Sequence, residues 1–319
     1  MLYLIDINAQ KTPPKVSPQK IEHLLIKASQ NWPDRLIEEI EDMIFDPTIS
    51  ASLTDRYAYA FPAGYHENYS PVQGVLDIQK VEEIIGTDDI ELELYEEQNN
   101  GKTEIRLKLY NTKTPLALSD VLPILENSGL NVITEFPSEI EPAKYDEIVW
   151  IHEFLLKKKD YLPDVDIEKA KEPFEDVFKK IWNGTLENDT LNMLSFYASM
   201  PWEDITILRT YLHYMRQTDV AYSLRYLESA ITTYPDIGKS LVAYFKESFD
   251  PKTAPLSERK RHNRINAIHK QLDAVSALDH DRIFRSLLGL MSATLRTKFY
   301  QLDDNGAQKS YLSIKLNRS

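Results

Sequence analysis

Hydrophobic residues in the first ninety positions recur three and four residues apart, the spacing of one face of an α-helix. This spacing predicts three helices. The first follows a Ser17 cap and carries Ile21, Leu24, Leu25 and Ala28, and the second follows Pro33 and carries Leu36, Ile37, Ile40 and Ile44. The third carries Leu53, Tyr57 and Ala60 and ends before Pro62. A fourth helix begins at Ser70, because Ser70 and Gln73 can cap each other's backbone N–H groups around Pro71. We expect it to bury Val72, Val75, Leu76 and Ile85 and to end at Gly86.

The period then changes from 3.6 to two, which is typical of half-buried strands. The alternating apolar positions are Ile90, Leu92 and Leu94, and then Ile105, Leu107 and Leu109. Asn100-Gly101 lies between these runs and predicts a two-residue hairpin turn, since both central positions of a type I′ turn need positive φ. With this turn Leu94 faces Leu107 and Leu92 faces Leu109. Glu93 then faces Lys108 on the side expected to be solvated.

A helix and two more strands complete the first part of the chain. We expect the helix to start at Ser119 or Asp120 and to end near Gly129, with strands over residues 132–136 and 148–155. The order αββαββ predicts an α+β domain over residues 63–160, a small antiparallel sheet with helices on one face. Residues 1–62 form a separate N-terminal helical segment in this interpretation.

From residue 161 onwards the apolar pattern is helical almost to the end. Five stripes carry it: Phe174 to Trp182, Trp202 to Met215, Leu224 to Ile231, Ile237 to Phe245, and Ile283 to Leu295. Short connections between helices favour a compact bundle, which we assign to residues 161–305. Alternation at residues 311–316 predicts a strand within a final segment, residues 306–319.

Charge supports a boundary near residue 160. Residues 1–160 contain 15 Lys and Arg against 29 Asp and Glu, a net −14, whereas residues 161–319 contain 22 against 21, a net +1. The overall charge of −13 disfavours binding to nucleic acid. The absence of cysteine, of an 18-residue apolar run and of a basic signal-peptide start leads us to expect a cytoplasmic protein without a membrane span.

The common signatures of cofactor and metal sites are absent from the sequence. No two of the nine glycines are separated by a single residue, which excludes G-x-G-x-x-G, and no Walker loop occurs. No two of the seven histidines stand four residues apart, so no helical pair is set to hold zinc. We therefore assign no catalytic, cofactor-binding or metal-binding residue.

Three polar features have a functional and a structural interpretation. His152 lies on an apolar strand, and we favour a structural role over a catalytic one. Glu187-Asn188-Asp189 resembles a carboxylate site, but capping of the helix before Leu191 is the simpler interpretation. Arg259-Lys260-Arg261 with Arg264 is either a solvated helix face or a contact for an acidic neighbour, such as the acidic first half of the chain or another subunit.

Longer blocks of sequence carry a family resemblance. They are RLKLY at 106–110, PLALSDVLPILEN at 115–127, IWNG at 181–184, LRTY at 208–211, LDHDRI at 278–283, ATLRT at 293–297 and KSYLS at 309–313. In this order they resemble the large bacterial NAD-specific glutamate dehydrogenases, in the region that precedes the catalytic domain.

The resemblance implies an enzyme that oxidatively deaminates L-glutamate to 2-oxoglutarate and ammonia with NAD as cofactor. It also implies an ACT-like domain, a helical bundle, a catalytic domain in the same polypeptide and a homo-oligomer. The family's catalytic lysine loop and glycine-rich nucleotide-binding fold find no match here. The chain is thus expected to be a non-catalytic regulatory or structural fragment, without a cofactor of its own.

Two other functions stay open. The α+β domain can be an amino-acid sensor, in which Ser119 and Asp120 at a helix start mark where backbone N–H groups would receive the carboxylate of an effector. Capping of the helix is the simpler explanation for these two residues. Alternatively, the chain is purely an oligomerisation module.

Overall fold

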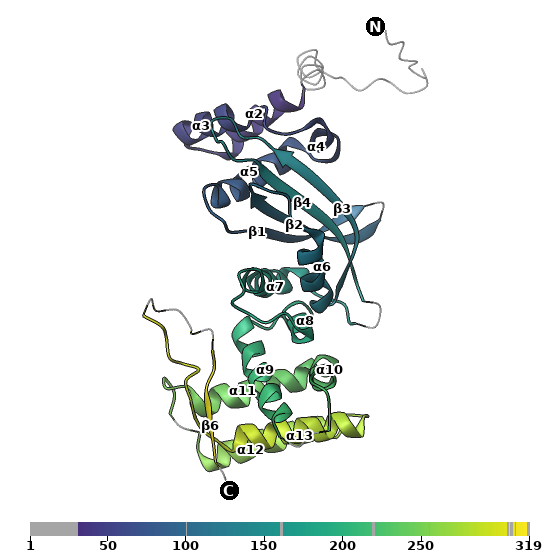
Figure 1. The fold of residues 1–319 in the computed structure, drawn as a ribbon, viewed down its shortest axis with the longest axis vertical. Coiled ribbons are helices and arrows are strands. Elements are labelled where there is room, and N and C mark those ends of the chain that lie inside the picture. Colours follow the sequence, from purple (N-terminus) through teal and green to yellow (C-terminus); the bar gives the residue numbers. More distant parts are fainter. Residues whose placement is uncertain are drawn as a thin grey trace, which may run out of the picture. The chain divides into compact units, whose positions relative to one another are not determined.

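The computed structural model describes residues 31–99, 101–159, 162–218, 221–254, 256–304, 306, 309 and 311–317. They form two compact units: residues 31–83 with 138–149, and the rest of the described chain from residue 84. The helix expected after Ser17 lies outside the described residues. Each unit is taken in turn, and Figure 1 shows the elements of both.

The first unit is built from helices. They are α2 (Trp32–Met43), α3 (Pro47–Tyr57), α4 (Ala63–Asn68) and α5 (Pro71–Ile84). Asn31 and Asp46 cap α2 and α3 with their side chains, and each of these helices has proline in its first turn. The capping box predicted at the start of α5 is present: Gln73 N–H donates to Ser70 Oγ at 3.3 Å, and Ser70 N–H to Gln73 Oε1 at 3.0 Å.

The buried face of α5 differs from the predicted one. Val72 and Leu76 are each 41% exposed, and the inward positions are Val75, Ile78, Val81 and Ile84. Gly74 explains the rotation, because a Cβ built there would lie 3.0 Å from the Trp32 ring and 3.1 Å from Leu36. The absence of a side chain at Gly74 lets α2 approach α5 on this side, which turns Val72 and Leu76 outward.

The second unit opens with an α+β arrangement, as predicted. Its elements are β1 (Glu91–Asn99), β2 (Lys102–Thr112), α6 (Leu118–Asn127), β3 (Leu130–Ile140) and β4 (Val149–Lys158). The strands form one antiparallel sheet in the order β1-β2-β4-β3. The predicted hairpin register is confirmed, with Leu94 opposite Leu107 and Glu93 opposite Lys108.

Part of the second face of this sheet is buried, contrary to the prediction. Lys108 is 2% exposed and Glu153 on β4 is 1% exposed. Arg106 lies between Glu97, Glu104 and Glu153, with nitrogen–oxygen distances of 2.7, 2.8 and 2.8 Å. The ion pair with Arg106 lowers the free-energy cost of removing the Glu153 carboxylate from water.

Helices make up most of the remainder. They are α7 (Ile167–Trp182), the 3₁₀ turn η1 (Thr190–Asn192), α8 (Met193–Tyr197), α9 (Trp202–Arg216), α10 (Leu224–Thr233), α11 (Pro235–Phe249), α12 (Glu258–Leu272) and α13 (Leu278–Ser292). A two-stranded antiparallel sheet follows, β5 (Thr294–Thr297) and β6 (Ile314–Leu316). Leu295, assigned to the last helix from its spacing, lies in β5 and is 57% exposed. None of the helices in the described part of the chain is long and apolar enough to cross a membrane.

One hydrophobic core runs through the second unit. It begins on the sheet with residues such as Leu92 and Leu107, continues through Phe174 of α7, and reaches Phe284 and Phe299. Helices α6 and α7 cover the apolar face of the sheet (Figure 1). The sheet and the helical bundle therefore share their core rather than each closing its own.

Candidate functional site

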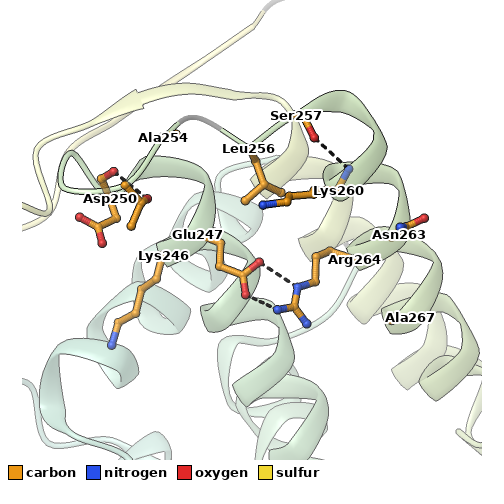
Figure 2. A pocket seen from close by; sticks show the side chains of 11 residues that line it. Lys246, Glu247, Asp250, Ala254, Leu256, Ser257, Lys260, Asn263, Arg264 and Ala267 are labelled. Atoms are coloured by element: carbon orange, nitrogen blue, oxygen red, sulfur yellow. Dashed lines mark hydrogen bonds and ion pairs between the residues drawn. The ribbon is translucent and has the colours of Figure 1, made fainter.

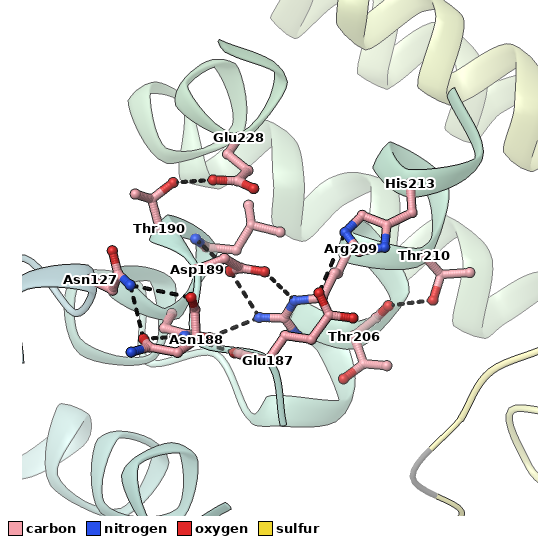
Figure 3. A network of polar contacts seen from close by, with 12 residues as sticks. Asn127, Glu187, Asn188, Asp189, Thr190, Thr206, Arg209, Thr210, His213 and Glu228 are labelled. Atoms are coloured by element: carbon pink, nitrogen blue, oxygen red, sulfur yellow. Dashed lines mark hydrogen bonds and ion pairs between the residues drawn. The ribbon is translucent and has the colours of Figure 1, made fainter. Parts of the chain in front are cut away.

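A polar junction lies between α6, α9 and α10, inside the second unit (Figure 3). Arg209 of α9, 5% exposed, is its centre. Its guanidinium donates to both oxygens of Asp189, at 2.5 and 3.0 Å, and to Asn192 Oδ1 at 2.8 Å. Bidentate pairing of this kind fixes the geometry of both partners. Asp189 also accepts from Leu191 N–H at 3.0 Å, so the capping role predicted for it is confirmed.

Neighbouring side chains extend the junction to three helices. Asn127, at the end of α6, donates to Asn188 Oδ1 at 2.9 Å. The Thr190 hydroxyl donates to Glu228 of α10, whose pKa is raised mainly by burial and further by the charge of Asp189. These contacts tie the loop before η1 to α6, α9 and α10.

The sequence-predicted effector residues lie elsewhere, at the start of α6. The helix begins at Leu118, and its N-cap, Ala117, makes no side-chain capping bond. Ser119 and Asp120 are both exposed, and neither caps the helix. Asp120 lines a hollow of about 390 Å³ together with Asp88, Asn111, Lys113, Leu116 and Trp182, among others. The first-turn N–H groups thus lie beside a hollow that already contains carboxylates.

His152 supports the loop that leads into this helix. It is 2% exposed, and its Nε2 accepts from Leu116 N–H at 3.1 Å. Its Nδ1 lies 2.6 Å from Glu135 Oε1. An acceptor at Nε2 places the proton of a neutral ring on Nδ1, which then donates to Glu135. This arrangement agrees with the structural role predicted for His152.

A second junction joins α9, α11 and α13 to the β5–β6 pair. The hydroxyl groups of Tyr211 and Thr294 lie 2.6 Å apart in a buried hydrogen bond, and burial raises the pKa of Tyr211 to about 12. Phe245 and Phe299 pack edge to face with centroids 5.6 Å apart. The backbone N–H of Asn317 donates to the Ala293 carbonyl at 2.9 Å, which holds β6 beside the end of α13.

A groove of about 860 Å³ lies between the end of α11 and the first half of α12 (Figure 2). Leu256, Ala254 and Ala267 line it together with Lys260 and other polar residues. Arg264 extends from α12 to Glu247 of α11, with its Nε 2.8 Å from the carboxylate. Of the basic cluster identified in the sequence, Lys260 and Arg264 line this groove, while all four residues of the cluster are exposed on α12.

Neither junction holds a recognisable catalytic set. Among the residues that the structure describes, no group of three His, Asp or Glu side chains could hold a metal ion. Sequence reasoning had not singled out Arg209 or Thr294 as site residues. The only signal for Arg209 was a charge beside Leu208 on the apolar stripe of α9.

Comparison with protein families gives matches along most of the chain. The glutamate dehydrogenase helical motif 2 matches residues 45–84, the ACT3 domain residues 89–170 and the helical motif 3 residues 186–251. The catalytic domain of bacterial NAD-glutamate dehydrogenase matches residues 267–319. That match begins inside α12, whereas the sequence had suggested a boundary at residue 306.

Individual relatives agree with these matches. The NAD-specific glutamate dehydrogenase of Pseudomonas aeruginosa is 38% identical over 95% of this chain and 19% of its own length. That of Halomonas elongata is 34% identical over 99% of the chain and 19% of its own length. The Mycobacterium tuberculosis protein of the same name is 30% identical over 93% of the chain and 18% of its own length. The chain thus spans about a fifth of the length of these relatives.

Proposed function

Because the chain belongs to the family of the bacterial NAD-specific glutamate dehydrogenases, we propose that it is a supporting part of such an enzyme. In this proposal it holds the opening elements of the catalytic domain in place and leaves the chemistry to the rest of that domain. The reaction of the whole enzyme would be the oxidative deamination of L-glutamate to 2-oxoglutarate and ammonia, with NAD accepting the hydride.

The junction between the helical motif and the β5–β6 pair carries this proposal. Residues 267–319 match the catalytic domain, and residues 186–251 match helical motif 3. Tyr211 and Phe245 of the helical motif contact Thr294 and Phe299 of the catalytic-domain match. A two-stranded sheet is marginally stable by itself, so β5 and β6 depend on this attachment.

The sequence agrees with a supporting role in which this chain binds no nucleotide itself. No glycine pattern of a dinucleotide-binding or P-loop site occurs in it. The buried polar side chains of the junction at Arg209 are engaged with one another, and no metal-binding group occurs in the part of the chain described by the structure. These observations favour support over catalysis.

The test compares glutamate-dependent NADH production by the 319-residue chain and by the chain extended through the complete catalytic domain. We expect activity only in the extended protein. In the extended protein, Thr294→Val removes the hydroxyl that meets Tyr211 and should lower the melting temperature and the activity, while Arg296→Gln at an exposed position of the same strand serves as the control. Turnover by the 319-residue chain alone would contradict the proposal.

A second candidate function is recognition of an amino-acid effector at the start of α6. The observation that favours it is a first turn without a side-chain cap beside a hollow. Calorimetric titration with the common amino acids should then give a heat of binding. An absence of heat with every amino acid would remove this candidate and leave the supporting role intact.

A further inference from the structure

The first half of α12 presents positive charge to solvent. Every residue from 258 to 264 is exposed. Residues 252–272 contain six Lys and Arg against one Glu. Arg259, Lys260 and Arg261 form no ion pair with any other residue that the structure describes. Cations left unpaired next to one another repel, and an anionic partner would relieve this repulsion.

The groove beside this basic face is large enough to bind a peptide segment and not only a small anion. Its wall includes Leu256, Ala254 and Ala267. Lys260 and Arg264 stand along its α12 side, and Glu247, which pairs with Arg264, stands with Asp250 on its α11 side (Figure 2). An apolar wall next to the exposed cations of α12 matches a segment that combines acidic residues with an apolar side chain.

The same chain contains such a segment at the end of α2. Glu38, Glu41 and Asp42 are exposed at helical spacing, and Asp34 lies one turn before them. Phe45 follows directly after the helix and is 94% exposed. We call Glu38, Glu41, Asp42 and Phe45 the acidic end of α2.

We propose that the groove at α12 binds the acidic end of α2 from a second copy of the chain. Lys260 and Arg261 would face Glu41 and Asp42, and Phe45 would contact the apolar wall at Leu256. Two copies that exchange this contact form a closed dimer with two identical interfaces, each joining a positive patch to a negative one.

Charge distribution favours a second copy over a nucleic acid as the partner. The chain as a whole carries a net charge of −13, which disfavours the approach of a phosphate backbone. In contrast, residues 1–160 carry a net charge of −14, and every copy of the chain has one such acidic segment and one groove. The proposal does not depend on the function proposed above, because it rests only on these two patches.

The first experiment measures the mass of the 319-residue chain by sedimentation equilibrium at low and high salt. We expect a dimer whose dissociation constant rises with salt, as an interface with exposed charges requires. Lys260→Glu with Arg261→Glu should weaken it about tenfold or more. The control, Arg225→Glu with Lys239→Glu, reverses two exposed cations on α10 and α11 and should leave the dimer unchanged.

The second experiment exchanges the charges. Glu41→Lys with Asp42→Lys should weaken self-association as much as the reversal on α12 does. An equimolar mixture of the two variants should associate again, because each copy then offers what the other lacks. Circular dichroism verifies that both variants are folded. A chain that is monomeric throughout, a dimer indifferent to both reversals, or variants that fail to recombine would overturn the proposal.

Discussion

At the scale of single residues, the close approach of Gly129 to Tyr197 is the most demanding feature. Gly129 follows α6 with a φ of +83°, and the Tyr197 hydroxyl donates to its carbonyl at 3.0 Å. A Cβ at this position would lie 2.6 Å from the Tyr197 ring. Both the backbone conformation and the space therefore require glycine.

We expect Gly129→Ala to lower the free energy of unfolding by about 2–4 kcal/mol, from about 1 kcal/mol of left-handed strain plus the cost of displacing the ring. Gly184 provides the matched control, since it follows α7 with a φ of +68° and has open space around it. Gly184→Ala should cost only about 1 kcal/mol. Equal losses in urea denaturation would show that the ring contact is unimportant.

Glu228 gives a pH dependence of known sign. Burial raises the pKa of its carboxyl, so the folded chain keeps the proton to a higher pH than the unfolded chain does. Stability from this group therefore falls as pH rises from the ordinary carboxyl pKa through the raised one. Glu228→Gln retains an acceptor for Thr190 and should stabilise the chain at a pH of about 8. The gain should vanish at a pH of about 4, as thermal unfolding at both pH values would reveal.

At the scale of elements, the loop before η1 depends on Arg209. The side chain bonds Asp189 and Asn192, and one of its amino groups, Nη1, is buried without a partner among the described residues. A buried pair that loses one partner leaves an uncompensated charge.

Arg209→Met should accordingly cost at most about 3–5 kcal/mol, because Asp189, whose side chain is 14% exposed, would remain charged without its partner. The double variant with Asp189→Asn should recover a large part of that loss, because no unpaired charge would be left. Urea denaturation of the two single variants and the double variant measures this coupling. Strictly additive losses would mean that the two side chains act independently.

Helices and strands could be predicted from the sequence where residues close in the chain determine them. The β1–β2 register follows from alternation and from Asn100-Gly101, and the start of α5 follows from Ser70 and Gln73. The orientation of α5 was missed because it depends on Trp32 meeting Gly74, a contact between distant residues. Leu295 fitted a helical period, but pairing with β6 gave it a strand conformation.

Only those contacts of the candidate site that join residues close in sequence could be predicted. Capping by Asp189 is a relation between neighbours and was foreseen. The Arg209 pair spans 20 residues of sequence, and the contact between Tyr211 and Thr294 spans 83. The spacing of residues within a helix contains no information about partners so distant in sequence. The sequence therefore indicated a function only through its family resemblance. Likewise, only the fold shows that the face with Lys108 is buried.

At the scale of the whole molecule, the shared core decides which pieces can fold. The apolar face of the sheet, with Leu92 and Phe154, packs in the same cluster as Phe174 and Phe178 of α7. A chain that stops at residue 165 keeps α6 but lacks α7, and so leaves the part of this face that α7 covers in water. Large apolar patches of this kind promote aggregation.

We therefore expect the chain cut after residue 165 to lose its sheet or to aggregate, whereas the 319-residue chain keeps both helices and sheet. Circular dichroism and the dispersion of amide NMR signals distinguish the outcomes. A monomeric, well-dispersed spectrum from the shorter chain would show that the sheet needs no support from α7.

The continuity of that core also bears on how such enzymes can be recombined. The matches to the ACT3 domain, helical motif 3 and the catalytic domain meet inside one hydrophobic cluster. A chimera joined between residues 170 and 186 would set core side chains from one parent against those of another, and at 38% identity many would differ in volume. The family's named segments are therefore poor units of exchange here. Residues 84–137 and 150–319 should be inherited together.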